Sequence, residues 1–412
     1  MRFNTGLLHD GVNRKEYHGA TLPPICQSSA FDQESAEGLE KIFEGTAPGY
    51  CYTRVGNPTI TAFENRITRL EGGVGSIACA SGMAAIFNAI MGIVQSGDEI
   101  ISCAGLYGGT IDLFHDLEAF GIKSTFIEPN NTGAIEAAFT ERTRLVFAET
   151  ISNPGLVVTD VEVLSEIAHK HDVPLILDNT TATAYLFKGL EHGADVVVNS
   201  SSKYINGSSN SISGILTLGG KFKWDIEKYP ALAEYKKFGP FAYIARLRNS
   251  LFRDMGACLS PQNAFLNLLG LETLGLRMER QCSNALDLAR FLQKEFPDLV
   301  VNYPGLNSST SHEIAKKQFG EKYGAIVTVR TGSKISAYSL INSLTIPYKL
   351  SNVGDTKTLV IHPASTISLH STDKEREDAG VYDDLVRISV GIEDVEDLKE
   401  DFANAVKLIS NS

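Results

Sequence analysis

Apolar runs and helix-like periodicity alternate along the chain from residue 59 to about residue 255. Short apolar runs predict strands at 76–80, 99–103, 124–128, 145–149, 173–178, 196–200 and 214–218. Apolar residues at helical spacing between these runs predict helices at 59–70, 83–94, 110–120 and 161–169. The alternation favours an α/β fold, in which helices cover both faces of a mostly parallel sheet.

The pattern changes on either side of this segment. Residues 1–58 are rich in turn formers and aromatic residues, which predicts an extended N-terminal arm. After residue 255 the sequence predicts amphipathic helices at 260–274 and 283–296, short strands near 325–329, 359–362 and 386–390, and a last helix at 395–409. We therefore expect an arm (1–58), an α/β domain (59–255) and a smaller α+β domain (256–412).

Composition and charge exclude several classes of protein. With 37 basic and 49 acidic residues the net charge is −12, which disfavours binding to nucleic acids or anionic membranes. The chain contains no apolar run near the ~20 residues that span a bilayer and begins without an apolar signal core, so we expect a cytoplasmic protein. The six cysteines lack C-x-x-C spacing, and we expect free thiols and no metal site.

Two predicted strands end on residues that suggest a cofactor. Asp178 closes the run 173–178, and Ser200 closes the run 196–200, which continues into Ser202 and Lys203. The carboxyl ends of parallel strands meet at one edge of the sheet, where ligands bind. Pyridoxal 5'-phosphate (PLP) needs an acid at its pyridine nitrogen, hydroxyl groups at its phosphate and an amine at its aldehyde. Taken alone, Asp178 could be a capping acid and Lys203 a surface lysine. The occurrence of both at strand ends favours the cofactor site.

Further candidates lie in neighbouring loops. Ser81-Gly82-Met83 joins a strand to a helix, where free backbone N–H groups at the helix N-terminus suit a phosphate, although an ordinary N-cap has the same pattern. Tyr107 follows another strand and could stack on a flat cofactor or lie in the core. Tyr52 and Arg54 occupy the arm, where the arginine could bind a phosphate, including one in another subunit.

Arg387 stands within an apolar strand of the C-terminal part. An arginine is seldom buried without a partner, and a substrate carboxylate would fit its planar fork. The alternative is a structural salt bridge with Asp383, Asp384 or Glu393.

Taken together, these motifs make the chain resemble the Cys/Met-metabolism family of PLP enzymes, the cystathionine γ-synthase group of fold type I. The likeness spans almost the whole chain. It rests on Tyr52-Thr-Arg54-Val-Gly-Asn-Pro-Thr59, Glu71-Gly-Gly, Ala80-Ser-Gly82, Leu106-Tyr-Gly-Gly-Thr110, Glu149-Thr-Ile-Ser-Asn-Pro154, Asp178-Asn-Thr180, Ser202-Lys203-Tyr and Val386-Arg-Ile-Ser-Val-Gly-Ile392. It implies a large, mostly parallel seven-stranded sheet domain and a smaller C-terminal α+β domain.

The resemblance also implies residue roles. Lys203 would carry the cofactor and move protons, Asp178 would pair with the pyridine nitrogen, and Tyr107 would stack on the ring. Other cofactor contacts would come from Ser81, Gly82, Met83, Thr180, Ser200 and Ser202, with Tyr52 and Arg54 of a neighbouring subunit. The substrate carboxylate would be bound by Asn153, Ser351, Asn352 and Arg387. A homodimer or homotetramer with shared sites is therefore expected.

The sulfhydrylase branch of the family is the most similar, which implies γ-replacement on O-acetyl-L-homoserine by sulfide or another sulfur donor to give L-homocysteine. Gly109 stands where methionine γ-lyases typically carry a cysteine. A γ-lyase or cystathionine-type activity is an alternative, and a non-catalytic PLP-binding protein is another. A nicotinamide enzyme is disfavoured, because Gly73-x-Gly75-x-x-Ala78 precedes a strand instead of following one.

Some positions depart from the family pattern. Asn199 replaces a usual histidine, Thr181 and Ala184 replace a commoner aromatic residue and proline, and Ser208-Ser-Asn-Ser211 replaces a glycine/histidine run. These changes leave open the shape of the pocket wall and the sulfur donor, which could be sulfide, a small thiol or a sulfur-carrier protein.

Overall fold

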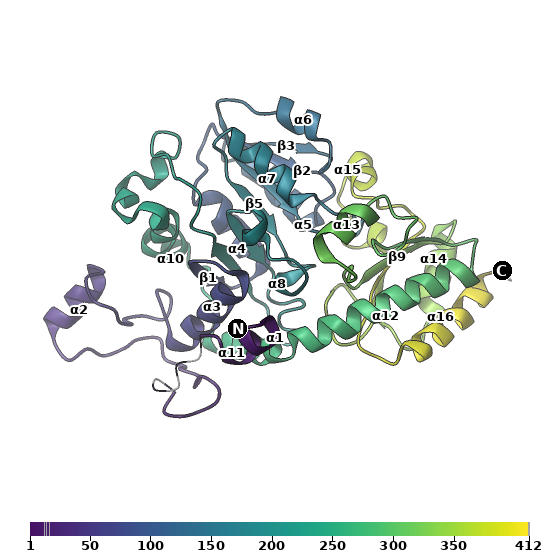
Figure 1. Ribbon diagram of the computed structural model, residues 1–412, viewed down its shortest axis with the longest axis horizontal. Helices are drawn as coiled ribbons and strands as arrows, with labels where there is room; N and C mark the ends of the chain where they lie inside the picture. The colour runs from purple at the N-terminus through teal and green to yellow at the C-terminus, as the bar shows by residue number, and fades with distance from the viewer. Residues whose placement is uncertain (12, 14, 16, 411–412) are drawn as a thin grey trace.

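The computed structural model describes residues 1–11, 13, 15 and 17–410 and confirms an α/β fold with two sheets (Figure 1). The larger sheet has seven strands in the order β1-β7-β6-β5-β4-β2-β3. They are β1 (Gly75–Cys79), β2 (Glu99–Cys103), β3 (Lys123–Ile127), β4 (Thr143–Glu149), β5 (Leu175–Asp178), β6 (Val196–Asn199) and β7 (Gly214–Leu218). Each strand lies within two residues of its predicted bounds.

Strands β3, β2, β4, β5 and β6 pair in parallel, and β7 runs antiparallel to both β6 and β1. Five helices connect these strands: α4 (Gly82–Met91), α5 (Gly108–Glu118), α6 (Thr132–Ala137), α7 (Val161–Lys170) and α8 (Thr183–Leu186), with a 3-10 turn at Gly189–His192. The carboxyl ends of β4, β5 and β6 therefore lie side by side, and the loops that follow them share one edge of the sheet.

The smaller sheet has the order β10-β11-β12-β9-β8. Its strands are β8 (Val300–Asn302), β9 (Ile326–Arg330), β10 (Tyr348–Lys349), β11 (Leu359–Ile361) and β12 (Leu385–Ser389). The helices of this part are α13 (His312–Phe319), α14 (Lys334–Ser343), α15 (Asp373–Asp378) and α16 (Val395–Ser410), with a 3-10 turn at Pro363–Ser365. The predicted strands near 325–329, 359–362 and 386–390 and the last helix are confirmed, while β8, β10 and helices α13 to α15 were not foreseen.

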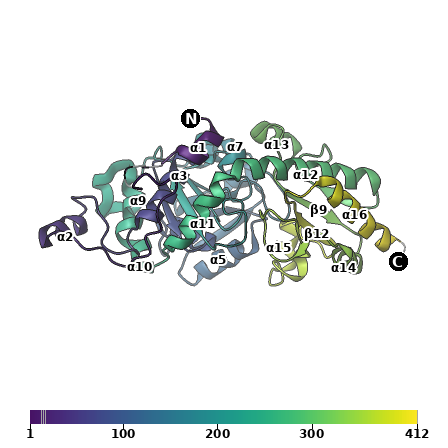
Figure 2. The same ribbon diagram turned by 90° about the horizontal axis from the view of Figure 1, so that it is seen from below.

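Helix α12 (Leu274–Glu295) links the two sheet regions (Figures 1 and 2). It contacts α1 and α8 along part of its length and α16, β8 and β9 along the rest. The prediction of a separate helix beginning at 283 was wrong, because buried residues continue the helical spacing back through Gln281 and Met278 to Leu274. The preceding helix α11 (Pro261–Glu272) packs against α3 (Pro58–Glu71).

Segment 220–258, between the seven-stranded sheet and α11, forms a 3-10 stretch at Pro230–Phe241, α9 (Ala242–Arg246), a π-helical turn at Leu247–Leu251 and α10 (Phe252–Met255). The N-terminal arm also differs from the extended arm expected, because it contains α1 (Phe3–His9) and α2 (Ala36–Phe43). Leu7 anchors α1 in the core, whereas α2 buries no residue and projects from the body in both views (Figures 1 and 2).

Within the described residues, no helix combines the length and apolar character needed to cross a membrane. The same residues contain no group of three or more His, Cys, Asp or Glu side chains arranged to hold a metal ion. All six cysteines are free, and Cys79, Cys103 and Cys282 are buried.

Candidate active site

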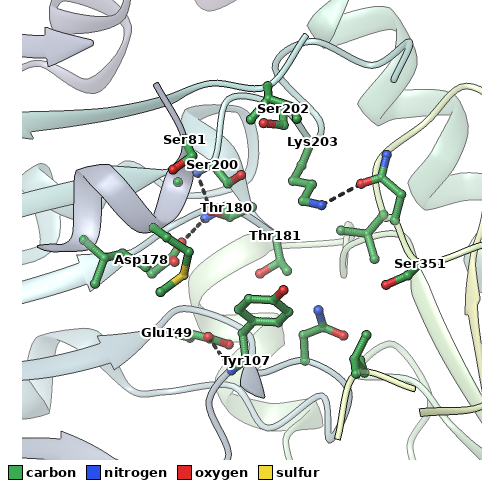
Figure 3. A pocket seen from close by; sticks show the side chains of 18 of the residues that line it. Ser81, Tyr107, Glu149, Asp178, Thr180, Thr181, Ser200, Ser202, Lys203 and Ser351 are labelled. Carbon is green, nitrogen blue, oxygen red and sulfur yellow. Dashed lines mark hydrogen bonds between the residues drawn. The ribbon is translucent and has the colours of Figure 1, made fainter. Parts of the chain in front are cut away.

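A cavity of about 480 Å³ opens at the carboxyl edge of the seven-stranded sheet and extends to the smaller sheet. It brings together most of the residues predicted from the sequence (Figure 3). The predicted residues that line it are Ser81, Gly82, Met83, Tyr107, Asn153, Asp178, Thr180, Ser200, Ser202, Lys203, Ser351, Asn352 and Arg387. Segments far apart in the chain thus meet at one site, as the parallel topology requires.

One wall of the cavity is the N-terminus of α4. The Ser81 hydroxyl caps this helix by accepting a hydrogen bond from Ala84 N at 3.1 Å. A Cβ atom at Gly82 would lie 2.6 Å from the Ser200 Cβ, so only glycine permits this approach. Ser202 is fixed on the other side, because its hydroxyl donates to Ser213 O and accepts from Ser213 N. Backbone N–H groups and hydroxyls converge here, as a phosphate group requires.

Asp178 lies at the end of β5, beside Glu149 at the end of β4. Its Oδ1 accepts a hydrogen bond from Thr180 N at 2.9 Å, and the Thr180 hydroxyl in turn accepts from Ser200 N. Burial raises the pKa of Asp178, and hydrogen bonds from Thr180 oppose that rise. Burial, and then the charge of Asp178, raises the pKa of Glu149 well above its usual value. We infer that Glu149 holds the proton, which leaves Asp178 as the anion of the pair.

Tyr107 lies in the turn between β2 and α5, and its ring projects toward the cavity near Thr181 (Figure 3). Its backbone N–H donates to Glu149 Oε1 at 2.8 Å, which ties the turn to the end of β4. A Cβ atom at Gly109 would lie 2.8 Å from the Tyr107 ring, and one at Gly108 would lie 2.6 Å from Ile367 O. Gly109 therefore leaves room for the ring, and Gly108 allows the close approach of the segment that contains Ile367.

Lys203 extends into the cavity from the loop after β6, and its Nζ donates to Asn352 Oδ1 at 2.6 Å (Figure 3). Burial lowers the pKa of Lys203 to about 8, and the nearby charge of Arg387 acts in the same direction. A lysine in this state is partly neutral near pH 8, so it can act as a nucleophile and as a proton acceptor.

Arg387 on β12 is buried, with 3% of its surface exposed. It donates to Asn153 Oδ1 and to the backbone oxygen of Asn352, both at 3.0 Å. Burial lowers its pKa to about 10. The alternative of a structural salt bridge is wrong: Asp384 pairs with Arg330, Glu393 accepts from Thr358, and Asp383 is near Arg376. A buried cation with neutral partners suits a bound anion.

Tyr52 and Arg54 are the predicted residues that do not reach the cavity of their own chain. Tyr52 is 45% exposed, and Arg54 lies 5.6 Å from the centre of its ring and donates to Arg253 O at 2.6 Å. Neither residue contributes to the site within a single chain.

Several cavity residues received no role from the sequence. They are Ile86, Glu149, Ile151, Thr181, Ser209, Ser211, Ile212, Leu350, Val353 and Ile367. The position of Glu149 at a strand end was a usable signal. Thr181, Ser209 and Ser211 were noted only as departures from the family pattern.

The donor set fits pyridoxal phosphate. A helix N-terminus with hydroxyls around it, an anionic carboxylate, an aromatic ring and a half-buried amine surround one cavity, and these are the groups that the phosphate, pyridine nitrogen, ring and aldehyde need. In this fit Ser81 to Met83, Ser200 and Ser202 would hold the phosphate.

Comparison with known proteins agrees with this fit. A family model described as Cys/Met metabolism PLP-dependent enzyme matches residues 4–407. The chain is 39% identical to an O-acetyl-L-homoserine sulfhydrylase of Corynebacterium glutamicum, covering 97% of this chain and 95% of that protein. It is 38% identical to an L-methionine gamma-lyase of Fusobacterium nucleatum subsp. polymorphum, covering 98% of each.

A solved structure is similar along the whole chain. It is described as an O-acetylhomoserine (thiol)-lyase of Campylobacter jejuni and contains N'-pyridoxyl-lysine-5'-monophosphate. Its TM-score is 0.94 at 33% identity, and the match covers 99% of this chain and 100% of that one. The chain belongs to the Cys/Met metabolism family of PLP-dependent enzymes, and pyridoxal phosphate is its cofactor.

Proposed function

We propose that the enzyme catalyses γ-replacement on O-acetyl-L-homoserine, in which sulfide or a small thiol displaces acetate to give L-homocysteine or its thioether. The observation that carries the proposal is that the half-buried amine of Lys203 and the buried guanidinium of Arg387 share one cavity with Asp178. Similarity to a named O-acetyl-L-homoserine sulfhydrylase supports the choice of substrate.

Substrate binding begins at Arg387. Its guanidinium would bind the α-carboxylate of the amino acid, with the Asn153 carboxamide beside it. The hydrogen bond from Arg387 to Asn352 O holds the 350–353 segment over the same part of the cavity. The amino acid is thereby oriented with its Cα toward Lys203.

Proton transfer falls to Lys203. The bound cofactor supplies an electron sink that stabilises negative charge next to its pyridine ring, which Asp178 keeps protonated. Lys203 would take the proton from substrate Cα and pass it to the cofactor side of the bound substrate, which returns the amine to its neutral form. The neutral amine would then take a second proton from Cβ, and acetate would leave Cγ with its bonding electron pair. The sulfur nucleophile then forms the new bond to Cγ, and Lys203 returns protons to Cβ and Cα. An amine with a pKa of about 8 can both accept and donate protons near neutral pH.

An assay of purified protein with O-acetyl- and O-succinylhomoserine, each with and without sulfide, tests the proposal. We expect homocysteine and acetate from the acetyl ester only when sulfide is present. Lys203→Ala should lower turnover by ~10⁴-fold or more, because repeated acid–base steps depend on one amine. Normal turnover of Lys203→Ala, or no homocysteine from the wild-type enzyme, would refute the assignment.

Elimination is the competing activity, since the chain is also similar to an L-methionine gamma-lyase. Release of 2-oxobutanoate and ammonia without a thiol would identify it. Gly109 favours replacement, because a side chain there would meet the Tyr107 ring at 2.8 Å and require it to shift. We therefore expect Gly109→Cys to raise the ratio of 2-oxobutanoate to homocysteine relative to wild type.

We further propose that the active unit is a homodimer, which can pair into a tetramer. Tyr52 and Arg54 lie outside the cavity of their own chain, and the arm that carries them exposes apolar side chains such as Phe43. An arginine from a second copy would complete the phosphate site. Light scattering that found an active monomer would overturn this proposal.

A further inference from the structure

A chain of hydrogen bonds leads from the Lys203 amine to a buried carboxylate outside the cavity. Lys203 Nζ donates to Asn352 Oδ1 at 2.6 Å, and Asn352 Nδ2 donates to Ser209 Oγ at 2.8 Å. The Ser209 hydroxyl donates to Asp355 Oδ2 in a short hydrogen bond. Four side chains from two separate loops, one after β6 and one between β10 and β11, thus form a single series.

The Asp355 end is held as an anion. Lys357 contacts its Oδ1 through Nζ at 2.8 Å and through the backbone N–H at 2.9 Å. Burial alone would raise the pKa of Asp355, but hydrogen bonds from Lys357 and Ser209 outweigh burial and keep the pKa below its usual range. An ionised carboxylate only accepts hydrogen bonds.

This anion sets the direction of every bond in the series. Ser209 must give its one proton to Asp355, so its oxygen is left as an acceptor for the Asn352 NH₂ group. The Asn352 carboxamide then presents its oxygen, and not its NH₂ group, to Lys203. The reversed carboxamide would place acceptor against acceptor at Ser209 and donor against donor at Lys203.

The backbone at Ser209 indicates that the hydroxyl matters. Its φ is +54°, in the left-handed region that glycine adopts more readily than serine. The loop is supported from inside, since Asn206 Oδ1 accepts from Ser208 N at 3.1 Å. A serine at such a position has a conformational cost, which its two side-chain hydrogen bonds offset.

We propose that Ser209 is a positioning residue: it couples Asp355 to Asn352 and so holds the Asn352 carboxamide with its oxygen toward the Lys203 amine. The inference rests on the proposed role of Lys203 and adds to it a reason for the serine-rich loop. The accepting oxygen orients the amine and stabilises its protonated form, against burial and the charge of Arg387.

The other charged groups around the Lys203 amine are not altered by a substitution at Ser209. Arg387 approaches from β12, and Asp178 and Glu149 line the same cavity from β5 and β4. Arg277 and Lys357 act on Asp355 from the far side. None of them contacts the Ser209 hydroxyl in the described structure, so removing this hydroxyl breaks the link between Asn352 and Asp355 and leaves these other groups in place.

The test uses the full-length protein with Ser209→Gly and the neighbouring Ser208→Gly as matched control. Glycine suits the backbone at 209, and melting temperatures would verify that each variant folds. With the cofactor removed, acetic anhydride labelling of Lys203 is followed from pH 6 to 10 by mass spectrometry. We expect Ser209→Gly to lower the midpoint of labelling by about one pH unit, the effect of losing one charge-assisted contact, and Ser208→Gly to leave it unchanged.

Asn352→Ala and the double variant identify the route. Because Ser209 acts through Asn352, the double variant should have the same midpoint as Asn352→Ala alone. In the holoenzyme, Ser209→Gly should shift the pH profile of kcat in the same direction with less effect on KM. An unchanged midpoint in Ser209→Gly, an equal shift in Ser208→Gly, or additive shifts in the double variant would overturn the proposal. The labelling result does not depend on which substrate the enzyme takes.

Discussion

Glu149 and Asp178 stand next to each other on adjacent parallel strands, and only one of them needs a charge. Asp178 receives hydrogen bonds from Thr180, whereas Glu149 is buried beside that anion and accepts from the Tyr107 backbone. A protonated Glu149 keeps the carbonyl-type acceptor that Tyr107 uses and adds no second negative charge to the cavity wall.

This assignment predicts that Glu149→Gln is nearly silent. The glutamine oxygen can accept from Tyr107 N, so kcat should stay within about threefold of wild type. Glu149→Ala removes the acceptor and should lower kcat by about tenfold or more, because the turn that carries Tyr107 loses its anchor. Steady-state kinetics of the two variants distinguish a protonated Glu149 from an ionised one. A large loss of kcat in Glu149→Gln would mean that the carboxylate is charged.

Another buried carboxylate, Glu71, lies beside Asn199 at the end of β6. Asn199 Nδ2 donates to Glu71 Oε1 at 3.0 Å. Glu71 Oε2 and Asn199 Oδ1 are both buried, and neither has a partner among the described residues. A proton on Glu71 Oε2 would give both atoms a partner, because this oxygen could then donate to Asn199 Oδ1. Burial raises the pKa of Glu71 from 4.5 to about 7, which favours this protonated form and gives the departure at Asn199 a physical role.

The folded chain therefore binds this proton more tightly than the unfolded chain does. Between about pH 4.5 and pH 7 the folded state holds more protons, so stability falls as pH rises, by roughly 3 kcal/mol for this group. Glu71→Gln cannot titrate, and its melting temperature relative to wild type should rise from pH 5 to pH 8. A constant difference between the two proteins over this interval would contradict the assignment.

Sequence patterns located the strand ends better than they located contacts across the fold. Asp178, Lys203 and the Ser81 turn follow directly from their strands, and all three line the cavity. The bond between Ser209 and Asp355 joins positions 146 residues apart, and no local pattern encodes such a pair. Neutral partners for Arg387 were equally hidden, because the nearby acids in the sequence pair elsewhere.

At the scale of elements, the apolar runs of β4, β5, β6 and β7 were predictable because these strands are buried along nearly their whole length. The short helices α1 and α2 and the helical turns of 220–258 lack a long amphipathic repeat. Capping and packing define them instead: the Ser35 hydroxyl accepts from Gly38 N at the start of α2, and Leu7 anchors α1 in the core.

The backbone of β7 lies very close to the turn into α4, at the cavity wall where the phosphate is expected. A Cβ atom at Gly214 would lie 2.1 Å from Ser81 O and 2.7 Å from Gly82 N. Both atoms belong to the backbone and cannot turn aside. Gly214→Ala should therefore displace the N-terminus of α4, lower the melting temperature and weaken PLP binding by about tenfold or more.

Gly133→Ala in α6 is the matched control for that substitution. No atom lies within 4 Å of a Cβ built at Gly133, so alanine should be neutral or stabilise the helix by up to about 1 kcal/mol. Cofactor affinity is measured from the absorbance of PLP bound to protein during dialysis. Normal PLP affinity in Gly214→Ala would contradict the prediction, because it would mean that displacing the N-terminus of α4 does not weaken cofactor binding.

At the scale of the whole molecule, the N-terminal arm has no evident role within a single chain. Helix α2 buries none of its residues and projects away from both sheets (Figure 2). The Tyr52-Thr53-Arg54 segment follows it, outside the cavity. An arm that reaches a second copy would place each Arg54 at the other chain's phosphate site, so that two incomplete chains form two complete sites.

Shared sites predict complementation between two inactive variants. Arg54→Ala lacks the contributed cation, and Lys203→Ala lacks the amine. In a hybrid dimer one site combines the intact Lys203 of the first variant with the intact Arg54 of the second, while the other site lacks both. Random exchange of equal amounts should therefore restore about one quarter of wild-type turnover, because half of the dimers are hybrids with one working site each. If Arg54 served its own chain, every site in the mixture would lack one group, and mixing would restore nothing.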